Sequence, residues 1–413
     1  MNKHLRWWML GFAFTATVIN YLDRQALSVA APVLRAEFHL RSLSYAHIVF
    51  AFLLAYTLMN GISGLLIDRL GTKIGYGLFV AWWSLSALLH SFAQGSTSLG
   101  MFRFLLGLGE AGNWPGAVKI VAEWFSPNER STASGIFNSG SAVGAILAPP
   151  IIAFMLLHYG WRSAFAIVGA AGFVWLVAWI FLYRSPVSGK EIQATPLPYK
   201  SLLRSRFVWT FTISKIFFDP VWYFYTFWFP EYLSHGRHFD MASIGRYGWI
   251  PFFIAGLGSA LGGLLSRGLL ACGSTITVAR KTAVSIAAIM MLAAIPSVLV
   301  QSAVTSIALI SLAMAGYTAG LANMLAMPAD VVPPDRVAFV YGFASMGSGF
   351  GGMIFTLLTG WLIDHYSYAP AFFLFGLIPI ACSLILWLWM GSLESQSHST
   401  AIGLTTTPST ETA

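Results

Sequence analysis

Residues 7–34 read WWMLGFAFTATVINYLDRQALSVAAPVL and carry an acid and a base inside an otherwise apolar run. A helix needs about 20 apolar residues to cross the hydrocarbon core of a bilayer, and this run is long enough. Asp23 and Arg24 then lie at membrane depth, where a charged side chain costs about 3 kcal/mol on insertion scales. Ionisable residues at that depth face a protein interior or a water-filled cavity. The segment 20–25, NYLDRQ, is therefore the point around which we interpret the rest of the chain.

The composition is that of a membrane protein. Of the 413 residues, 57% are hydrophobic and only 9% are charged, whereas a soluble domain is about 25% charged. The net charge of +8 comes from basic residues in short loops, so it indicates membrane topology rather than a nucleic-acid-binding surface. Cys272 and Cys382 predict free thiols without a disulfide framework. The sequence has no phosphate-binding glycine loop and no metal-ligand cluster, which predicts no cofactor and no metal and argues against an enzyme or an ATP-driven pump.

Twelve apolar runs predict an all-α membrane protein with twelve transmembrane helices. Their length and the lack of two-residue alternation exclude transmembrane strands. The runs occupy residues 8–31, 44–67, 74–93, 98–122, 131–157, 162–183, 207–233, 242–266, 280–300, 303–329, 337–363 and 368–391.

The distribution of Lys and Arg predicts that both chain termini are cytoplasmic. Basic residues concentrate in the cytoplasmic loops of membrane proteins. With the N-terminus inside, five of the 23 basic residues fall in outer loops, four fall within spans and the remaining fourteen are cytoplasmic. The outer five are Arg35, Arg41, Arg162, Arg237 and Arg246, and the four within spans are Arg24, Arg103, Lys119 and Lys215.

The longest polar gap divides the chain into two related halves. We expect two pseudo-symmetric six-helix bundles, residues 1–183 and 207–391, joined by a cytoplasmic loop at 184–206. A tail rich in Ser and Thr, residues 392–413, is expected to be disordered and cytoplasmic. The relation between the halves is carried by glycines that recur 207 residues later: Gly109, Gly135, Gly140 and Gly144 match Gly316, Gly342, Gly347 and Gly351.

The loop after the second span carries a motif with specific spacing. Residues 64–73 read GLLIDRLGTK and fit the pattern G-x-x-x-D-R-x-G-x-R/K. Gly64 permits close helix approach, Asp68 can meet a helix N-terminus, and Arg69 and Lys73 hold the loop in the cytoplasm. An ordinary charged turn is the alternative. With this spacing at this position, the chain resembles the Major Facilitator Superfamily, and the resemblance implies that family's two-bundle fold.

Further segments resemble one branch of that family, the anion:cation symporters, and within it the bacterial hexuronate transporters. The resemblance covers nearly the whole chain apart from the tail. The segments are INYLDRQ in the first span, RFLLGLGEAGNWPGAVKIVAEWFSPNER in the fourth, SGIFNSGSAVGAILAPP in the fifth and KIFFDPVWYFYTFWFPEYL in the seventh.

The fourth span contains a second acid and a second base. Arg103 and Glu110 are seven residues apart, so both point from one helix face, about 10 Å apart along the axis. Gly107, Gly109 and Gly112 flank Glu110 and let a neighbouring helix or a substrate come close. A carboxyl group in such a cavity can change protonation as its surroundings change. A structural interhelical ion pair is the alternative, chiefly for Arg103.

Asp23 and Arg24 point about 100° apart on a helix, so each needs a partner elsewhere. The simplest pairing joins Asp23 to Arg103 and leaves the planar fork of Arg24 free for an anionic substrate. The resemblance implies the same roles: the first-span arginine contacts the substrate carboxylate, and the first-span aspartate and fourth-span glutamate carry protons. Those positions are Arg24, Asp23 and Glu110.

Four other residues are candidates for substrate binding. Tyr21 and Tyr56 match aromatic positions that face the cavity in the resembled branch, and their hydroxyls could bond a sugar; packing explains them equally well. Asn138 and Ser141 in the fifth span could add hydrogen bonds, although small polar residues also serve helix packing. Arg130, near the cytoplasmic end, is expected to take part in an inner gate.

Two pairs of opposite charges are spaced four residues apart. Lys119 and Glu123 are expected to be structural or to join Arg130 in the inner gate. For Lys215 and Asp219 an ion pair within the helix is one interpretation, and a functional role is the alternative. Pro220 follows the second pair and predicts a kink in the seventh span.

One segment departs from the hexuronate transporter pattern. Many such sequences carry His-Gln-Gly-Trp in the tenth span, where residues 317–320 of this chain read YTAG. The C-terminal side of the binding site therefore differs, which leaves the identity of the sugar acid open.

These features predict a secondary transporter that takes up a hexuronate with protons by alternating access across the bacterial inner membrane. Its partners are the organic anion, protons and the lipid bilayer, and we expect a monomer. A same-branch carrier of aldonates, aldarates or aromatic carboxylates is the alternative. A membrane sensor or enzyme is more remote, because the short loops offer neither an output domain nor a nucleophile with a positioned base.

Overall fold

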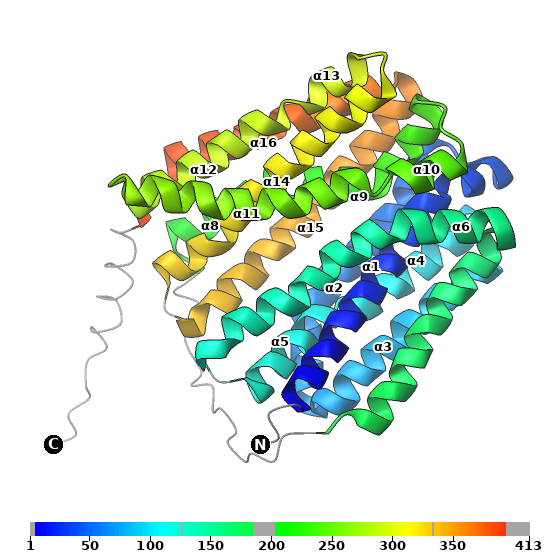
Figure 1. Cartoon of the computed structure of the whole chain (residues 1–413), viewed down its shortest axis with the longest axis horizontal. Coiled ribbons are helices and arrows are strands. Elements are labelled where there is room, and N and C mark those ends of the chain that lie inside the picture. The colour runs from blue at the N-terminus through cyan, green and yellow to red at the C-terminus, as the bar shows by residue number, and fades with distance from the viewer. Residues whose placement is uncertain (1–4, 126, 185–202, 333, 394–413) are drawn as a thin grey trace. The chain divides into compact units, whose positions relative to one another are not determined.

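The computed structural model describes residues 5–125, 127–184, 203–332 and 334–393, and every regular element in these ranges is helical (Figure 1). Most of the expected central loop and nearly all of the expected tail lie outside the described residues. The elements are α1 (Leu5–Glu37), α2 (Ser42–Leu70), α3 (Thr72–Leu89), η1 (His90–Phe92), α4 (Ser96–Glu110), α5 (Asn113–Trp124), α6 (Pro127–Leu182), α8 (Arg206–Phe218), α9 (Pro220–Glu231), η2 (Tyr232–Gly236), α10 (Met241–Tyr247), α11 (Ile250–Ala271), α12 (Ile276–Met291), α13 (Ala294–Leu299), α14 (Ala303–Val331), α15 (Pro334–His365) and α16 (Tyr368–Trp389).

Each predicted span coincides with one helix, part of one helix or an interrupted helix, and the predicted all-α membrane fold is confirmed. Several spans are interrupted: α4 and α5 are separated by residues 111–112, and α8 and α9 by Asp219. The fifth and sixth predicted spans form one element, α6, which bends at Gly160 (φ 75°, ψ 167°). Glycine adopts this left-handed φ with little steric cost, so the bend falls there.

Seven of the described helical stretches are long and apolar enough to cross a membrane. One of them, residues 133–182 within α6, contains two predicted spans. The other four predicted spans correspond to α1, which carries several charges, to α3, which is short, and to α4 with α5 and α8 with α9, which are interrupted.

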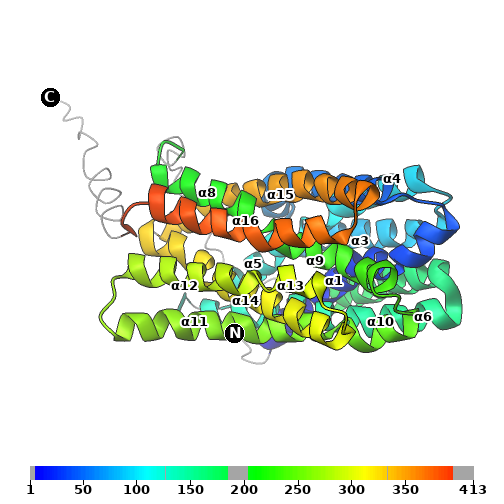
Figure 2. The same ribbon diagram turned by 90° about the horizontal axis from the view of Figure 1, so that it is seen from above.

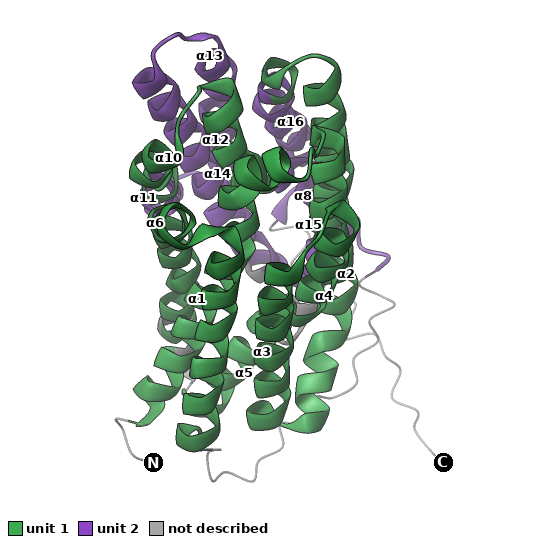
Figure 3. Ribbon diagram, turned by 90° about the vertical axis from the view of Figure 1, so that its right-hand side faces the viewer, with its two compact units in different colours: residues 1–195, 222–253, 349–371 green, residues 196–221, 254–348, 372–413 purple. Residues whose placement is uncertain are grey.

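The chain divides into two compact units (Figure 3). Unit 1 contains residues 1–195, 222–253 and 349–371, and unit 2 contains residues 196–221, 254–348 and 372–413. Two segments from the second half of the chain thus pack with the N-terminal helices. The division into two bundles of six helices stays a prediction.

Within each unit, long helices pack side by side. In unit 1, α1 packs along α6 and α2 along α4. In unit 2, α12 lies alongside α14, as the two views agree (Figures 1 and 2).

The repeated glycines make equivalent helix contacts in the two halves. A Cβ atom at Gly140 of α6 would lie 2.7 Å from the Phe14 carbonyl of α1. At Gly347 of α15 it would lie 2.9 Å from the Thr212 carbonyl of α8. Real Cβ atoms do not come so close, so both positions need a residue without a side chain. Small residues of this kind let membrane helices pack at short range.

The start of α2 is capped by another helix. Its preceding residue, Arg41, has no side-chain acceptor for the free N–H groups of the first turn. Asp364 of α15 supplies one, and its two carboxylate oxygens accept from the N–H groups of Ser42 and Leu43 at 2.8 and 2.9 Å. A carboxylate is stabilised by the positive end of a helix dipole. This contact holds α2, which carries Tyr56, to the segment 349–371 of unit 1.

Candidate functional site

A buried ion pair joins α1 to α4 in unit 1. Nε and Nη2 of Arg24 donate to Oε2 of Glu110 at 3.0 and 2.9 Å. Arg24 is 5% exposed and Glu110 is fully buried. The other carboxylate oxygen, Oε1, has no hydrogen-bond partner in the described part of the chain. The expectation that Arg24 stands free for an anion is therefore wrong in this structure, because Glu110 occupies its guanidinium.

Three aromatic rings surround the Arg24 guanidinium. Its Cζ atom lies 4.8 Å from the ring centroid of Tyr56, 5.1 Å from that of Tyr21 and 5.2 Å from that of Phe52. The negative face of an aromatic ring attracts a cation, more strongly when water is excluded. Sequence reasoning found the two tyrosines but missed Phe52. Phe52 is four residues from Tyr56 on α2, so both rings lie on one helix face, and this spacing could have predicted Phe52 as a further site residue.

Arg103 of α4 does not pair with the Asp23 carboxylate, so the predicted pairing is wrong. Its Nη2 donates to the main-chain carbonyl of Arg24 at 2.6 Å, and its Nη1 donates to the carbonyl of Asp23 at 3.4 Å. A helical carbonyl has a second lone pair that can accept such a bond. Arg103 is fully buried and thus ties α4 to the main chain of α1 directly beside the Arg24–Glu110 pair.

Three polar side chains of the segment 20–25 are buried without hydrogen-bond partners among the described residues. Asn20 and Gln25 are fully buried and Asp23 is 2% exposed. None of the nitrogen or oxygen atoms of these side chains has a partner. Buried polar groups are nearly always hydrogen-bonded, and a lone buried carboxylate is costly. The segment therefore keeps free capacity to bind a proton or a polar ligand next to the ion pair.

The fourth span is broken directly after Glu110. Pro115 lacks the N–H group that would bond the carbonyl of Ala111 in a continuous helix. The hydroxyl of Ser63 on α2 donates to that carbonyl instead, at 3.1 Å. The break places Glu110 at the end of α4, and Ser63 replaces the hydrogen bond that the break removes. Sequence reasoning missed Ser63. The signal for it is Pro115, which leaves the Ala111 carbonyl in need of another donor.

Two glycines bring neighbouring helices close to Glu110. A Cβ atom at Gly107 would lie 3.1 Å from the backbone nitrogen of Tyr56 on α2. At Gly109 it would lie 2.7 Å from the backbone nitrogen of Trp83 on α3. The predicted role of these glycines in close helix approach is confirmed.

The remaining predicted substrate residues do not join this site. Ser141 donates to the carbonyl of Asn138 in its own helix, α6, at 2.7 Å. Asn138 is exposed. Neither side chain bonds Arg24 or Glu110 in the described ranges, so their role in binding remains a prediction.

The loop motif between α2 and α3 is arranged differently from the expectation. Asp68 bonds Nζ of Lys119 at 2.7 Å rather than a helix N-terminus. A Cβ atom at Gly64 would meet Pro115 at an ordinary 3.8 Å, so close approach is not its role here. Arg69 is exposed.

A neighbouring glycine and Lys73 shape this turn. Gly71, the second glycine of the motif, has φ 77° and makes the tight turn between the helices. The carbonyl of Lys73 accepts from the indole of Trp179 at 2.9 Å.

Lys119 and Glu123, which are expected to be structural, bond other residues rather than each other. With Lys119 bound to Asp68, Glu123 accepts from the hydroxyls of Thr72 and Tyr183, the latter at 3.0 Å. The side chain of Arg130 lies outside the described residues, so the proposed inner gate is not tested.

Comparison with known proteins identifies the family. A model of the Major Facilitator Superfamily matches residues 13–279 and 268–408. The chain belongs to the Major Facilitator Superfamily.

Relatives of this superfamily member include carriers of sugar acids. It is 29% identical to the hexuronate transporter of Escherichia coli (strain K12) over 93% of this chain and 94% of the relative. It is 33% identical to the galacturonate transporter of Dickeya chrysanthemi over 64% of this chain and 82% of the relative. A probable galactarate/D-glucarate transporter of Escherichia coli (strain K12) is 28% identical over 93% of each chain.

A solved structure shares the fold. A bacterial homolog of the human lysosomal transporter Spinster, in an inward-facing and unoccupied conformation, superposes with a TM-score of 0.74. The two sequences are 20% identical, and the match covers 97% of this chain and 99% of the other. Membership of the superfamily and the apolar helical stretches together make this chain a multi-pass membrane protein.

Unit 2 of this superfamily member contains its own buried ion pair. Nζ of Lys215 lies 2.7 Å from Oδ2 of Asp219, so the two residues form the ion pair that their four-residue spacing suggests. Asp219 separates α8 from α9, and the expected interruption before Pro220 is confirmed. The hydroxyl of Tyr317 on α14 donates to Oδ1 of Asp219 at 3.4 Å.

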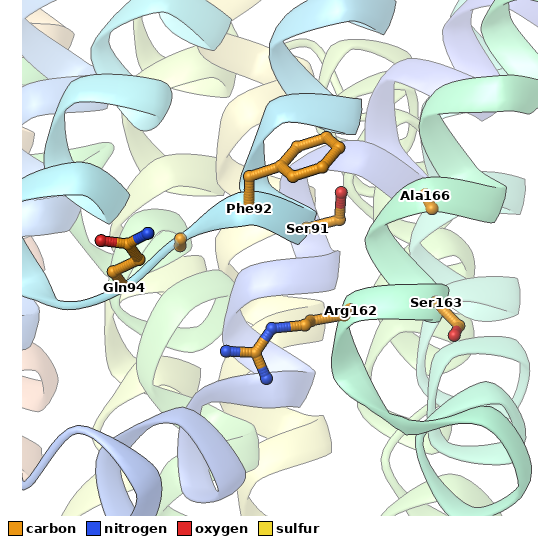
Figure 4. Close-up of a pocket in the computed structure, with 7 residues that line it drawn as sticks. Ser91, Phe92, Gln94, Arg162, Ser163 and Ala166 are labelled. Atoms are coloured by element: carbon orange, nitrogen blue, oxygen red, sulfur yellow. The ribbon is translucent and has the colours of Figure 1, made fainter.

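A surface pocket in unit 1 contains none of the predicted site residues. Figure 4 shows Arg162 extending from α6 toward the segment 91–94, with Ser163 and Ala166 on the same helix. The Arg162 guanidinium is already paired with Glu37 at 3.0 Å. The pocket therefore adds no free charge for an anion.

Proposed function

We propose that the chain takes up a sugar acid together with protons, by alternating access, across the bacterial inner membrane with both termini in the cytoplasm. A hexuronate such as glucuronate or galacturonate is the favoured substrate. The names of the relatives support this substrate class. The observation that carries the proposal is the buried Arg24–Glu110 pair beside the unpartnered Asp23 carboxyl.

The ion pair gives a physical basis for coupling. A substrate carboxylate fits the planar fork of Arg24, which suits two oxygens. Because Glu110 already accepts from Nε and Nη2 of Arg24, an incoming anion that takes the same two donors displaces it. A buried carboxylate without its cation is strongly unfavourable, so the displaced Glu110 takes a proton. Binding of the anion and of the proton thus favour each other.

Asp23 and Arg103 complete this arrangement. The Asp23 carboxyl has no bonding partner among the described side chains, which makes it a second proton-binding group. Arg103, bonded to the main chain at residues 23 and 24, keeps α1 in register with α4. Its role is therefore positioning. Tyr21 and Tyr56 flank the bound carboxylate and offer hydroxyls to the sugar.

Other functions remain as alternatives. A same-branch carrier of aldonates, aldarates or aromatic carboxylates uses the same arginine, and the galactarate/D-glucarate relative supports the aldarate version. A membrane sensor is a remote alternative, and an enzyme is disfavoured because the relatives are transporters.

Uptake into proteoliposomes tests the proposal. With the outside acidic, the reconstituted wild-type protein should accumulate labelled glucuronate or galacturonate, and a protonophore should abolish accumulation. Arg24→Ala should raise the half-saturating concentration about a hundredfold, because a desolvated charge pair is worth about 3 kcal/mol. Arg162→Ala, which removes an exposed arginine, is the control and should not change it. Uptake that ignores the proton gradient would refute symport, and unchanged affinity in Arg24→Ala would refute the carboxylate site.

A further inference from the structure

The side chain of Asn113 joins three helices of unit 1 just after the break that follows Glu110. Asn113 is the first residue of α5, which packs against both α1 and α3 (Figures 1 and 3). Its Oδ1 accepts from the hydroxyl of Tyr76 on α3 at 2.8 Å. Its Nδ2 donates to the hydroxyl oxygen of Thr17 on α1 at 3.2 Å. The side chains of all three bonded residues are fully buried.

The direction of these hydrogen bonds explains why an amide fits at this position. The hydroxyl hydrogen of Thr17 is already donated to the carbonyl of Ala13 at 2.8 Å, so Thr17 accepts from Asn113. With Nδ2 facing Thr17, the amide presents Oδ1 to Tyr76, whose hydroxyl donates to it. A neutral amide can donate on one side and accept on the other. An aspartate lacks the donor, and a leucine lacks both groups.

Both partners of this amide are held in place by their own surroundings. A Cβ atom at Gly116 would lie 2.2 Å from the ring of Tyr76, so α5 rests directly on that ring. Trp175 and Trp179 contact the same ring edge-on, with centroids at 5.7 and 5.4 Å. The threonine partner is fixed by the bond to its own helix. The start of α5 is therefore anchored to α1 and α3.

Helix α1 thus holds the broken span at two points, one on each side of the break. Thr17 bonds Asn113 after the break. Arg24 bonds Glu110 before it. Thr17 and Arg24 are seven residues apart on α1, so they lie on one helix face, about 10 Å apart. The contact of Arg24 with Glu110 depends on the charge of the carboxylate, whereas the neutral contact of Thr17 with Asn113 does not respond to a proton.

We propose that Asn113 is a positioning residue, which anchors the start of α5 and so keeps Glu110 on Arg24 until an anion displaces it. The proposal rests on the proton coupling proposed above. With the anchor in place, the broken span meets α1 in one register, and the ion pair forms in one geometry. Without the anchor the span can shift along α1, and the pair opens although no anion is bound. Glu110 then takes up and releases protons alone, and the proton gradient is dissipated.

Proton leak in proteoliposomes tests this role. Thr17→Val removes the acceptor for Nδ2 and nearly keeps the size of the side chain, and Asn113→Leu removes both hydrogen bonds of the amide. With no sugar acid present, both variants should admit protons about ten times faster than wild type, per amount of folded protein. A pH-sensitive dye inside the vesicles measures this influx. Proton-driven accumulation of labelled glucuronate should fall, while counterflow without a gradient stays within about twofold of wild type.

Two threonine variants are the controls. Thr17→Ser keeps the acceptor oxygen and should leak as little as wild type. Thr359→Val, also in unit 1, removes a fully buried hydroxyl that bonds a carbonyl of its own helix, that of Phe355 at 2.7 Å, and should not leak either. A merely structural role would lower accumulation and counterflow together and would not raise the leak. If Asn113→Leu does not fold, Thr17→Val decides.

The outcomes separate the two proposals. If wild type accumulates sugar acid but Thr17→Val leaks no more than Thr17→Ser or Thr359→Val, the positioning role is refuted and the proposed function stands. If folded wild-type protein takes up no sugar acid, or takes it up without regard to the proton gradient, the proposed function is refuted and the positioning role with it.

Discussion

The buried ion pairs Arg24–Glu110 and Lys215–Asp219 have similar chemistry but different construction. Arg24 and Glu110 lie on two helices, 86 residues apart in the chain, whereas Lys215 and Asp219 are four residues apart in one span. A pair between helices changes when the helices move or when one partner is neutralised. A pair within one helical turn is set by its own helix and keeps its geometry. The difference supports the proposed role of the first pair in coupling, because only that pair can respond to a movement of α1 against α4.

The largest expected effect is the loss of proton-coupled accumulation when Glu110 of the first pair is neutralised. Glu110→Gln keeps the shape of the side chain and can still accept from Arg24, but it cannot take up and release a proton. An uncoupled carrier only equilibrates its substrate, so the ratio of internal to external substrate should fall to about one while counterflow continues. The measurement is labelled hexuronate uptake with and without an imposed proton gradient.

A neutralised carboxylate elsewhere provides the control for that measurement. Glu37→Gln changes an exposed partner of Arg162 and should retain accumulation. If Glu110→Gln still concentrates its substrate, coupling must be reassigned, first to Asp23.

The next effect, on stability, tests whether the second pair is structural. Lys215→Leu leaves Asp219 buried without its cation and should lower the free energy of unfolding by about 3–5 kcal/mol. The double variant Lys215→Leu with Asp219→Leu should lie within about 1 kcal/mol of wild type, because apolar residues replace a buried pair without loss. Denaturant unfolding of the purified protein in detergent measures both. A double variant as unstable as the single one would mean that the pair holds the fold together.

The same comparison explains what the sequence could predict about the site. Helix geometry fixes which residues share a face, so the Lys215–Asp219 pair and the common face of Arg103 and Glu110 could be predicted. The depth and rotation of α4 against α1 are not encoded in local spacing. For that reason the predicted Asp23–Arg103 contact is wrong, and Arg103 meets main-chain carbonyls instead.

Spacing alone also does not decide a pairing. Lys119 and Glu123 have the same four-residue spacing as Lys215 and Asp219, yet Lys119 bonds Asp68. Near the end of a span, neighbouring helices and loops offer competing partners, whereas deep in a span few are available. The predicted helices were reliable because their apolar length is itself the physical requirement for crossing a bilayer.

The smallest expected effect concerns the helix break that places Glu110 at the end of α4. Ser63→Ala removes the donor to the Ala111 carbonyl, which Pro115 already leaves without its helical partner. The loss should be about 1–2 kcal/mol in the free energy of unfolding, the cost of one unsatisfied buried acceptor. Ser345→Ala is the control, because that exposed hydroxyl bonds a carbonyl of its own helix, and it should change stability by less than about 0.5 kcal/mol. Equal effects would show that the carbonyl finds another donor and that Ser63 does not support the break. If Ser63→Ala loses more stability than Ser345→Ala and also has a higher KM for the hexuronate, the break positions Glu110 for Arg24. Lys215 and Asp219 need no such support, because they are only four residues apart.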